Sequence, residues 1–255
     1  MISITSAQLD TWLAMLIYPL TRILSLIASA PVFGNKQVPA RVKIGLSVLL
    51  AIIIAPTLGA MPAVPAGSPQ GLVIMVQQII IGISMGFALR VVFTAVEMAG
   101  DLIGLQMGLG FASFYDPLNA AYTPIIGRWL GMIAALAFLA MNGHLYVLSA
   151  LAESFRTLPV GSAMLGSGHY EMARWGGSIF AFALQISLPI VGALLITNIA
   201  LGILTRAAPQ LNLFAVGFPI TLSIGFLVLA MSMSYFIPLL DRLVQEGLNL
   251  ISTIR

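Results

Sequence analysis

Charge is what this sequence has least of. Only 7% of its 255 residues are Asp, Glu, Lys or Arg, against roughly 25% in an ordinary soluble domain. Hydrophobic residues make up 60% of the chain, and the mean hydropathy is +1.05. A soluble domain of this size needs a polar exterior that this composition cannot supply. The chain is therefore predicted to be an integral membrane protein.

Cysteine is absent from the sequence, which excludes disulfides and thiolate metal sites. The net charge of +3 is spread out without a basic stripe, so nucleic-acid binding is not expected. His144 and His169 are far apart and near no paired acids, so no metal site is expected either. The glycines form no phosphate-binding pattern, and no acid pair or nucleophile–base set is visible. We therefore expect no enzyme activity and no cofactor.

Long apolar runs fill most of the chain. A helix needs about 20 largely apolar residues to cross a bilayer, and about six runs meet or nearly meet that length. They are Leu9–Ala30, Ile44–Met61, Leu72–Val96, Ile125–Leu151, Ser178–Leu204 and Leu211–Leu240. The predicted fold class is all-α, with about six long apolar helices kinked or broken by the prolines inside the runs. The loop that contains Lys36, Arg41 and Lys43 is expected on the cytoplasmic side.

Two aligned sets of residues mark the third run. One is a polar stripe at helical spacing, made of Arg90, Thr94, Glu97 and Asp101. It is typical of an internal ion pair, the interpretation we favour, or of a wall that faces a channel. The other set is small residues four apart, which let helix backbones approach closely: Gly82 with Gly86, and Gly100 with Gly104 and Gly108. The helix is therefore expected to continue to about Gly108, against a partner helix.

The segment "GLGFASFYDPLNAAYTP" follows that helix, and its helical pattern fails after Gly108. Gly110 permits a turn, and "YDP" favours a reversal of the chain. Non-helical backbone is tolerated at membrane depth only where it is buried in protein or lines an aqueous path. Two interpretations stay open. The segment is either an interfacial loop with its aromatic residues at the headgroups, or a loop whose apolar side chains close a pore.

Three separated segments resemble the flagellar biosynthetic protein FliR family: "PVFGNKQVPARVKIGL", "GFALRVVFTAVEMAGDLIGLQMGLGFASFYDP" and "TRAAPQLNLFAVGFPITL". That family is the flagellar member of the export-gate subunits of type III secretion. The resemblance implies one export-gate membrane domain over residues 1–255, with a FliP-like first part and a FliQ-like last part. It also implies that the protein is a subunit and not an enzyme. The subunit would form part of the channel through which unfolded flagellar proteins leave the cytoplasm. Its location would be the bacterial inner membrane, at the flagellar basal body.

Partners and site residues follow from the same resemblance. FliP-like and FliQ-like subunits would share one complex with this chain, FlhA and FlhB would cooperate with it, and membrane lipid would surround it. The loop after the third helix would plug the closed channel, through Gly108, Gly110, Phe111, Phe114, Tyr115, Asp116, Pro117 and Tyr122. Arg206, Gln210 and Asn212 lie between the last two runs. They are predicted to bind a partner or to satisfy helix-end carbonyls.

Two other functions remain alternatives to an export-gate subunit. A self-sufficient small-molecule or ion transporter would use the broken helices and Arg90 as a site in the middle of the membrane. No inverted repeat is visible in the sequence, which weakens that interpretation. An intramembrane enzyme is the least supported, since it would need reactive side chains in a recognisable arrangement. A transporter is expected to purify alone, whereas a gate subunit is expected to purify with its partners.

Overall fold

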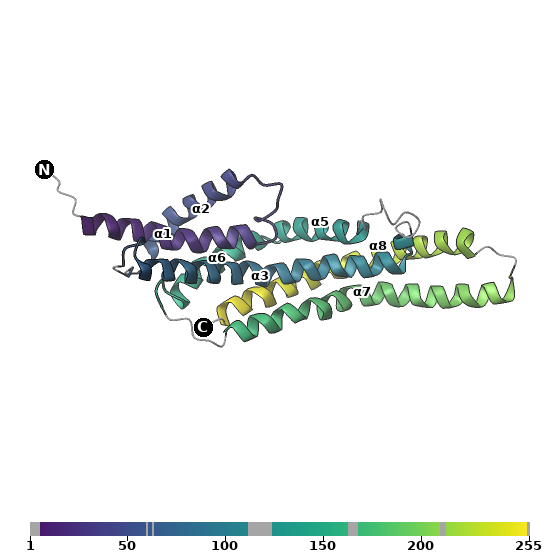
Figure 1. Ribbon diagram of the computed structural model, residues 1–255. Coiled ribbons are helices and arrows are strands. Elements are labelled where there is room, and N and C mark those ends of the chain that lie inside the picture. The colour runs from purple at the N-terminus through teal and green to yellow at the C-terminus, as the bar shows by residue number, and fades with distance from the viewer. Residues whose placement is uncertain are drawn as a thin grey trace. The chain divides into compact units, whose positions relative to one another are not determined.

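A computed structural model describes residues 6–59, 61–62, 64–111, 124–162, 168–209 and 213–253. Within these ranges the chain forms seven α-helices and two short 3-10 helices, with no strand (Figure 1). The α-helices are α1 (Ser6–Ser29), α2 (Ala40–Ile54), α3 (Pro69–Gln106), α5 (Ile125–Ala140), α6 (Gly143–Thr157), α7 (Gly168–Ala207) and α8 (Leu213–Thr253). The 3-10 helices are η1 (Ala55–Thr57) and η2 (Leu109–Phe111). The predicted all-α fold is confirmed.

The number of helices that could cross a membrane agrees with the prediction of about six. Among the described residues, five helices are long and apolar enough, or six if α5 and α6 count as one broken span. The predicted extension of the third helix past its apolar run is confirmed, because α3 continues to Gln106. At 1.5 Å per residue α3 is about 57 Å long, well beyond the ~30 Å hydrocarbon core of a bilayer.

The fourth apolar run differs from the prediction. Ile125–Leu151 is not one helix, because α5 ends at Ala140 and α6 begins at Gly143. Asn142 between them has a φ of 60°, in the left-handed region that asparagine tolerates better than most residues. Gly143 follows it and brings no side chain into the turn. The Asn–Gly pair inside an apolar run is the local signal for this break.

The prolines inside the other helices do not break them. Pro19 lies within α1, Pro189 within α7, and Pro219 and Pro238 within α8, and each helix continues on both sides. Of the two effects expected of these prolines, a kink or a break, a break does not occur at these positions. A proline removes one intrahelical hydrogen bond, but neighbouring helices in a membrane protein can satisfy the carbonyl that it frees.

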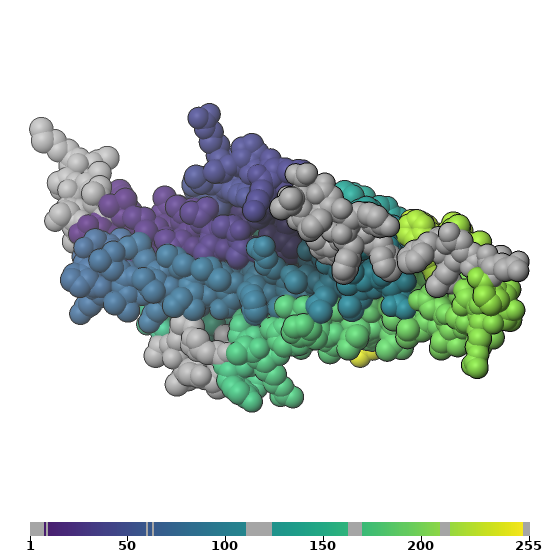
Figure 2. Space-filling view, turned by 45° about the vertical axis from the view of Figure 1, so that its right-hand side comes forward, coloured from purple at the N-terminus to yellow at the C-terminus, as the bar shows by residue number. Residues whose placement is uncertain are grey.

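Unit 1, one of two compact units in the chain, contains residues 1–91, 142–176 and 244–255. Within it α1 lies along the first half of α3, and α2 packs beside α1 (Figures 1 and 2). The Tyr18 hydroxyl on α1 donates to the Val64 carbonyl oxygen at 2.9 Å, and Trp175 Nε1 at the start of α7 donates to the Ala88 carbonyl oxygen of α3 at 2.9 Å. These long-range hydrogen bonds join distant segments to the α1–α3 pair.

Unit 2 contains residues 92–141 and 177–243, and its interior is apolar. Phe93 of α3 packs edge-to-face on Phe138 of α5, with the ring centroids 5.7 Å apart. Ile103 of α3, Leu130 of α5 and Ile190 of α7 are also buried, and all three line one small pocket. In a membrane such an interior is stabilised by close packing, because lipid tails are as apolar as the side chains themselves.

Apolar side chains also cover much of the outside of the chain. The span in α2 is only 11% buried and those in α7 and α8 are 22% buried, whereas the span in α3 is 61% buried. α3 is therefore the most buried of the candidate spans. The outer faces of α2, α7 and α8 are suited to contact with lipid or with other protein chains.

Candidate functional site

The predicted plug begins where α3 ends. Gly108 has a φ of 84°, in the left-handed region open to glycine, and its N–H donates to the Leu105 carbonyl oxygen at 3.1 Å. This is the usual glycine cap of a helix C-terminus. Gly110 lies in η2, which directly follows the cap. The Phe111 side chain and the rest of the predicted plug lie outside the described residues: Phe114, Tyr115, Asp116, Pro117 and Tyr122.

Gly100 lies where the backbones of α3 and α5 touch. A Cβ built on Gly100 would lie 2.5 Å from the Gly127 Cα. A Cβ built on Gly127 would in turn contact Asp101 Oδ1 and lie 2.7 Å from the Glu97 carbonyl oxygen. On the next turn of α5, a Cβ on Gly131 would lie 3.2 Å from Glu97 Oε1. Gly127 and Gly131 are missing from the predicted packing residues, although their four-residue spacing is the same signal.

Gly104, one turn after Gly100, is packed less tightly. A Cβ built there would lie 3.5 Å from Ile126 Cγ1, which is an ordinary contact distance. The two glycines share one face of α3, yet only Gly100 leaves no room for a side chain. Sequence spacing alone does not distinguish them.

Asp101 places an unused hydrogen-bond acceptor beside the start of the predicted plug. Its Oδ1 atom is buried and has no hydrogen-bond partner, which is uncommon for a buried oxygen. The residue borders a small pocket that is also lined by Gly110 and Pro124. About 10 Å³ of that pocket is open to the centre of a water molecule, roughly what a single water needs.

The rest of the predicted polar stripe lies at the surface of the chain. Arg90 and Glu97 are exposed, and Thr94 is half-buried. Asp101 is half-buried like Thr94, and its Oδ1 atom is buried at the α3–α5 contact. An ion pair within the stripe and a contact with a partner both remain predictions.

Gly82 and Gly86 bring α3 against α1. A Cβ on Gly82 would contact Ser25 Oγ and the Arg22 carbonyl oxygen, and a Cβ on Gly86 would contact Ser29 Oγ. The two serine hydroxyls are already engaged with carbonyl oxygens of α1, so they have little freedom to move aside. The glycine spacing predicted a close helix contact, but it did not reveal that the partner is α1.

Arg22 is the only buried charged side chain among the described residues, with 0% of its surface exposed. Its Nε donates to Gln78 Oε1 at 2.7 Å. Its Nη1 donates to the Ser154 carbonyl oxygen at 2.8 Å, and its Nη2 donates to the Leu158 carbonyl oxygen at 2.8 Å. The guanidinium also lies 4.1 Å from the centroid of the Phe155 ring. One side chain of α1 thereby joins α3 to the end of α6.

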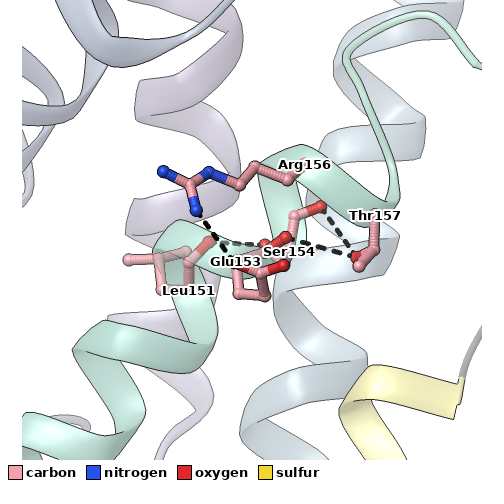
Figure 3. A network of polar contacts seen from close by, with 5 residues as sticks. All are labelled: Leu151, Glu153, Ser154, Arg156 and Thr157. Carbon is pink, nitrogen blue, oxygen red and sulfur yellow. Dashed lines mark hydrogen bonds and ion pairs between the residues drawn. The ribbon is translucent and has the colours of Figure 1, made fainter.

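The turn that receives Arg22 is the last turn of α6. Figure 3 shows that Ser154 Oγ donates to the Leu151 carbonyl oxygen at 2.7 Å, while Arg156 pairs with Glu153 at 3.5 Å. The Ser154 carbonyl oxygen also accepts the Leu158 N–H at 2.9 Å, and carbonyl oxygens at a helix C-terminus carry partial negative charge. They can therefore stabilise a buried guanidinium without a carboxylate. An arginine deep in an apolar run is the sequence signal for this site, but its partners come from residues far along the chain.

The remaining predicted residues lie at the end of α7. Arg206 is exposed in the last turn of that helix, and Gln210 and Asn212 lie outside the described residues. In the part of the chain that the structure describes, no three His, Cys, Asp or Glu side chains gather as metal ligands would.

Comparison with known proteins gives matches along nearly the whole chain. Residues 13–247 match the family model described as "Bacterial export proteins, family 1". The chain is 43% identical over 255 residues to the flagellar biosynthetic protein FliR of Escherichia coli (strain K12), covering 100% of this chain and 97% of that protein. The FliR of Pectobacterium carotovorum subsp. carotovorum is 41% identical with the same coverage. The FliR of Bacillus subtilis (strain 168) is 32% identical over 217 residues, or 84% of this chain and 83% of that protein.

Proposed function

Because this chain belongs to the family of bacterial export proteins, family 1, we propose that it is a FliR-like, non-enzymatic subunit of the flagellar protein-export gate. In this proposal it forms part of the channel through which unfolded flagellar proteins leave the cytoplasm. The gate lies in the bacterial inner membrane, at the base of the flagellum. The observation that carries the proposal is similarity to FliR proteins over the full length of the chain, with no large segment left over for another function.

The exposed apolar helices support a role inside a larger assembly. We propose that FliP-like and FliQ-like subunits pack against this chain and that FlhA and FlhB cooperate with the complex. Residues 1–255 then act as one export-gate domain, with a FliP-like first part and a FliQ-like last part. α2, α7 and α8 are the helices with the most unburied apolar surface in the single chain, so they are the ones best placed to contact partners or lipid.

The segment after α3 is proposed to plug the closed channel. It follows a capped helix end, and it carries the aromatic residues Phe111, Phe114 and Tyr115 within five positions. Bulky apolar side chains in a pore exclude water and so block ions. Gly82 and Gly86 hold α3 against α1, and Gly100 holds α3 against α5. The plug and the scaffold are therefore expected to be separable by mutation.

The test replaces Phe111, Phe114 and Tyr115 with alanine in the chain expressed together with its partner subunits. The complex should assemble as in the wild type, because the glycine contacts of the helices are unchanged. The membrane should leak ions, since the smaller side chains no longer exclude water from the pore. Assembly is measured by co-purification, and leak by loss of membrane potential and slowed growth.

A control replaces three exposed aromatic residues on helices other than α2, α7 and α8: Trp12, Trp129 and Tyr146. This variant loses at least as much aromatic surface away from the proposed plug and from the proposed partner-contacting helices, so it should assemble and should not leak. If the plug variant assembles and holds its membrane potential, the plug assignment is wrong. If it fails to assemble while the control assembles, the segment is a structural clamp.

A further inference from the structure

Met107, at the end of α3, packs into a notch on α8 that exists because Gly225 has no side chain. Met107, the residue after the last helical residue of α3, has 0% of its surface exposed. A Cβ built on Gly225 of α8 would lie 2.7 Å from Met107 Cγ, 2.8 Å from Cε and 2.9 Å from Sδ. The whole thioether therefore lies across the space that a side chain at position 225 would occupy.

A hydroxyl group one turn earlier on α8 reaches the backbone at the same point. Thr221 is buried, and its hydroxyl lies 3.0 Å from the Phe218 carbonyl oxygen and 3.4 Å from the Met107 carbonyl oxygen. The second contact is long and individually weak. Together, Thr221 and Gly225 hold both the carbonyl group and the side chain of Met107 against one face of α8.

Met107 is also the last buried residue before the left-handed turn at Gly108. Gly108 takes a left-handed conformation, and Leu109–Phe111 forms a single 3-10 turn. Only three residues separate Met107 from Phe111, the first aromatic residue of the proposed plug. Met107 therefore lies at the start of the short connection that leads from α3 to Phe111.

We propose that Met107 and Gly225 form a lock that positions the segment after α3, with Thr221 steadying the backbone of Met107. This inference rests on the proposed plug function of that segment. Met107 and Gly225 are positioning residues, because they act on the plug only through the chain that connects them to it. The glycine at position 225 leaves room for the thioether, which lies where a side chain of that residue would be.

The test is Gly225→Ala in the complex with partner subunits, compared with Gly202→Ala on α7. A Cβ at Gly202 meets nothing within 4 Å, so the control adds the same methyl group without a clash. The added methyl at position 225 displaces Met107 from its notch. We expect several-fold faster oxidation of Met107 by dilute peroxide, read by peptide mass spectrometry, and a several-fold larger ion leak. The control should match the wild type in both measurements.

The compensating variant Gly225→Ala/Met107→Ala tests whether the effect of Gly225→Ala comes from the clash with Met107 or from general damage to the helices. Alanine lacks the Cγ, Sδ and Cε atoms that the new methyl group meets, so the double variant should regain a sealed membrane. If Gly225→Ala alone does not assemble, recovery of both assembly and sealing in the double variant supports the lock. Failure of the double variant to recover overturns it.

A variant shortened by residues 111–117 distinguishes failure of the lock from failure of the plug. If the shortened loop leaks while Gly225→Ala stays sealed and keeps Met107 protected, the lock is wrong and the plug stands. If the shortened loop does not leak, the plug is wrong. In that case the oxidation rate of Met107 in Gly225→Ala tests separately whether Met107 packs against Gly225. An unchanged rate would show that it does not.

Discussion

Arg22 is a buried arginine that has no carboxylate partner among the described residues. Arg22 satisfies its donors with an amide oxygen on α3 and with two carbonyl oxygens at the end of α6. A guanidinium can do this because its donors point in fixed directions within one plane. The same charge on a flexible lysine would reach fewer of these acceptors. Arg22 is therefore a three-helix clamp, and its charge is stabilised by the C-terminus of α6.

Arg22→Met is expected to destabilise the purified complex clearly. The change removes the donors that reach Gln78 Oε1 and the Leu158 carbonyl oxygen, and each buried acceptor left unpaired costs about 1–3 kcal/mol. Arg22→Lys should be intermediate, because it keeps the charge but loses the fork of donors. The measurement is the thermal midpoint of the complex together with its yield.

Arg174→Met supplies the control for this substitution. Arg174 is exposed on α7, so the same chemical change there should leave the thermal midpoint close to that of the wild type. A wild-type midpoint for Arg22→Met would contradict the clamp.

Close backbone contacts between helices decide the arrangement at the scale of elements. α3 presents Gly82 and Gly86 to α1, and Gly100 to α5. Without side chains at these positions the backbones approach to van der Waals distance, which is the main source of helix association within a membrane. α1 and α5 therefore both contact α3 at its glycine residues.

Gly100→Ala and Gly104→Ala form a matched pair on one face of α3. Alanine at position 100 would overlap the Gly127 backbone, which cannot rotate away as a side chain can, and such overpacking typically costs about 1–3 kcal/mol. Alanine at position 104 meets only an ordinary contact with Ile126. We expect a large drop in the yield of assembled complex for the first variant and near-normal yield for the second. Equal yields would show that α3 and α5 are not in backbone contact in the assembly.

The boundary between α5 and α6 shows where local sequence patterns mislead. Hydropathy favours one span across Ile125–Leu151. It is averaged over a window of residues, so it does not detect a change of backbone conformation at a single residue. Asn142 and Gly143 allow a left-handed turn, and the helix ends there although the residues on both sides are apolar. The prolines predict either a kink or a break, and the structure shows that α1, α7 and α8 continue through them.

At the scale of the whole molecule, the single chain leaves much apolar surface uncovered. α2 is 11% buried across its span, and residues such as Ile52, Ile196 and Met231 are mostly exposed. Lipid can cover such surface. The similarity to FliR proteins instead favours cover by partner subunits over much of it.

The chain expressed without FliP-like and FliQ-like partners is therefore expected to aggregate or to be degraded. Expressed with them, it should elute as one large complex in mild detergent. The comparison is made by size-exclusion chromatography and by the half-life of the chain in a pulse-chase experiment. A stable, monodisperse and folded monomer would contradict the export-gate proposal and would favour the self-sufficient transporter.

The sequence by itself determined the class of the protein, its all-α fold, the approximate number of spans and the long reach of α3. These follow from composition and from spacing within one segment, which a sequence displays directly. Only the tertiary structure decided that Gly82 and Gly86 face α1, that Gly100 faces Gly127, and which atoms receive the donors of Arg22. Each of these contacts joins segments distant in the sequence, and many pairings of apolar helices satisfy the same local pattern. The choice among them depends on which faces fit without overlap, and that is a property of three-dimensional packing.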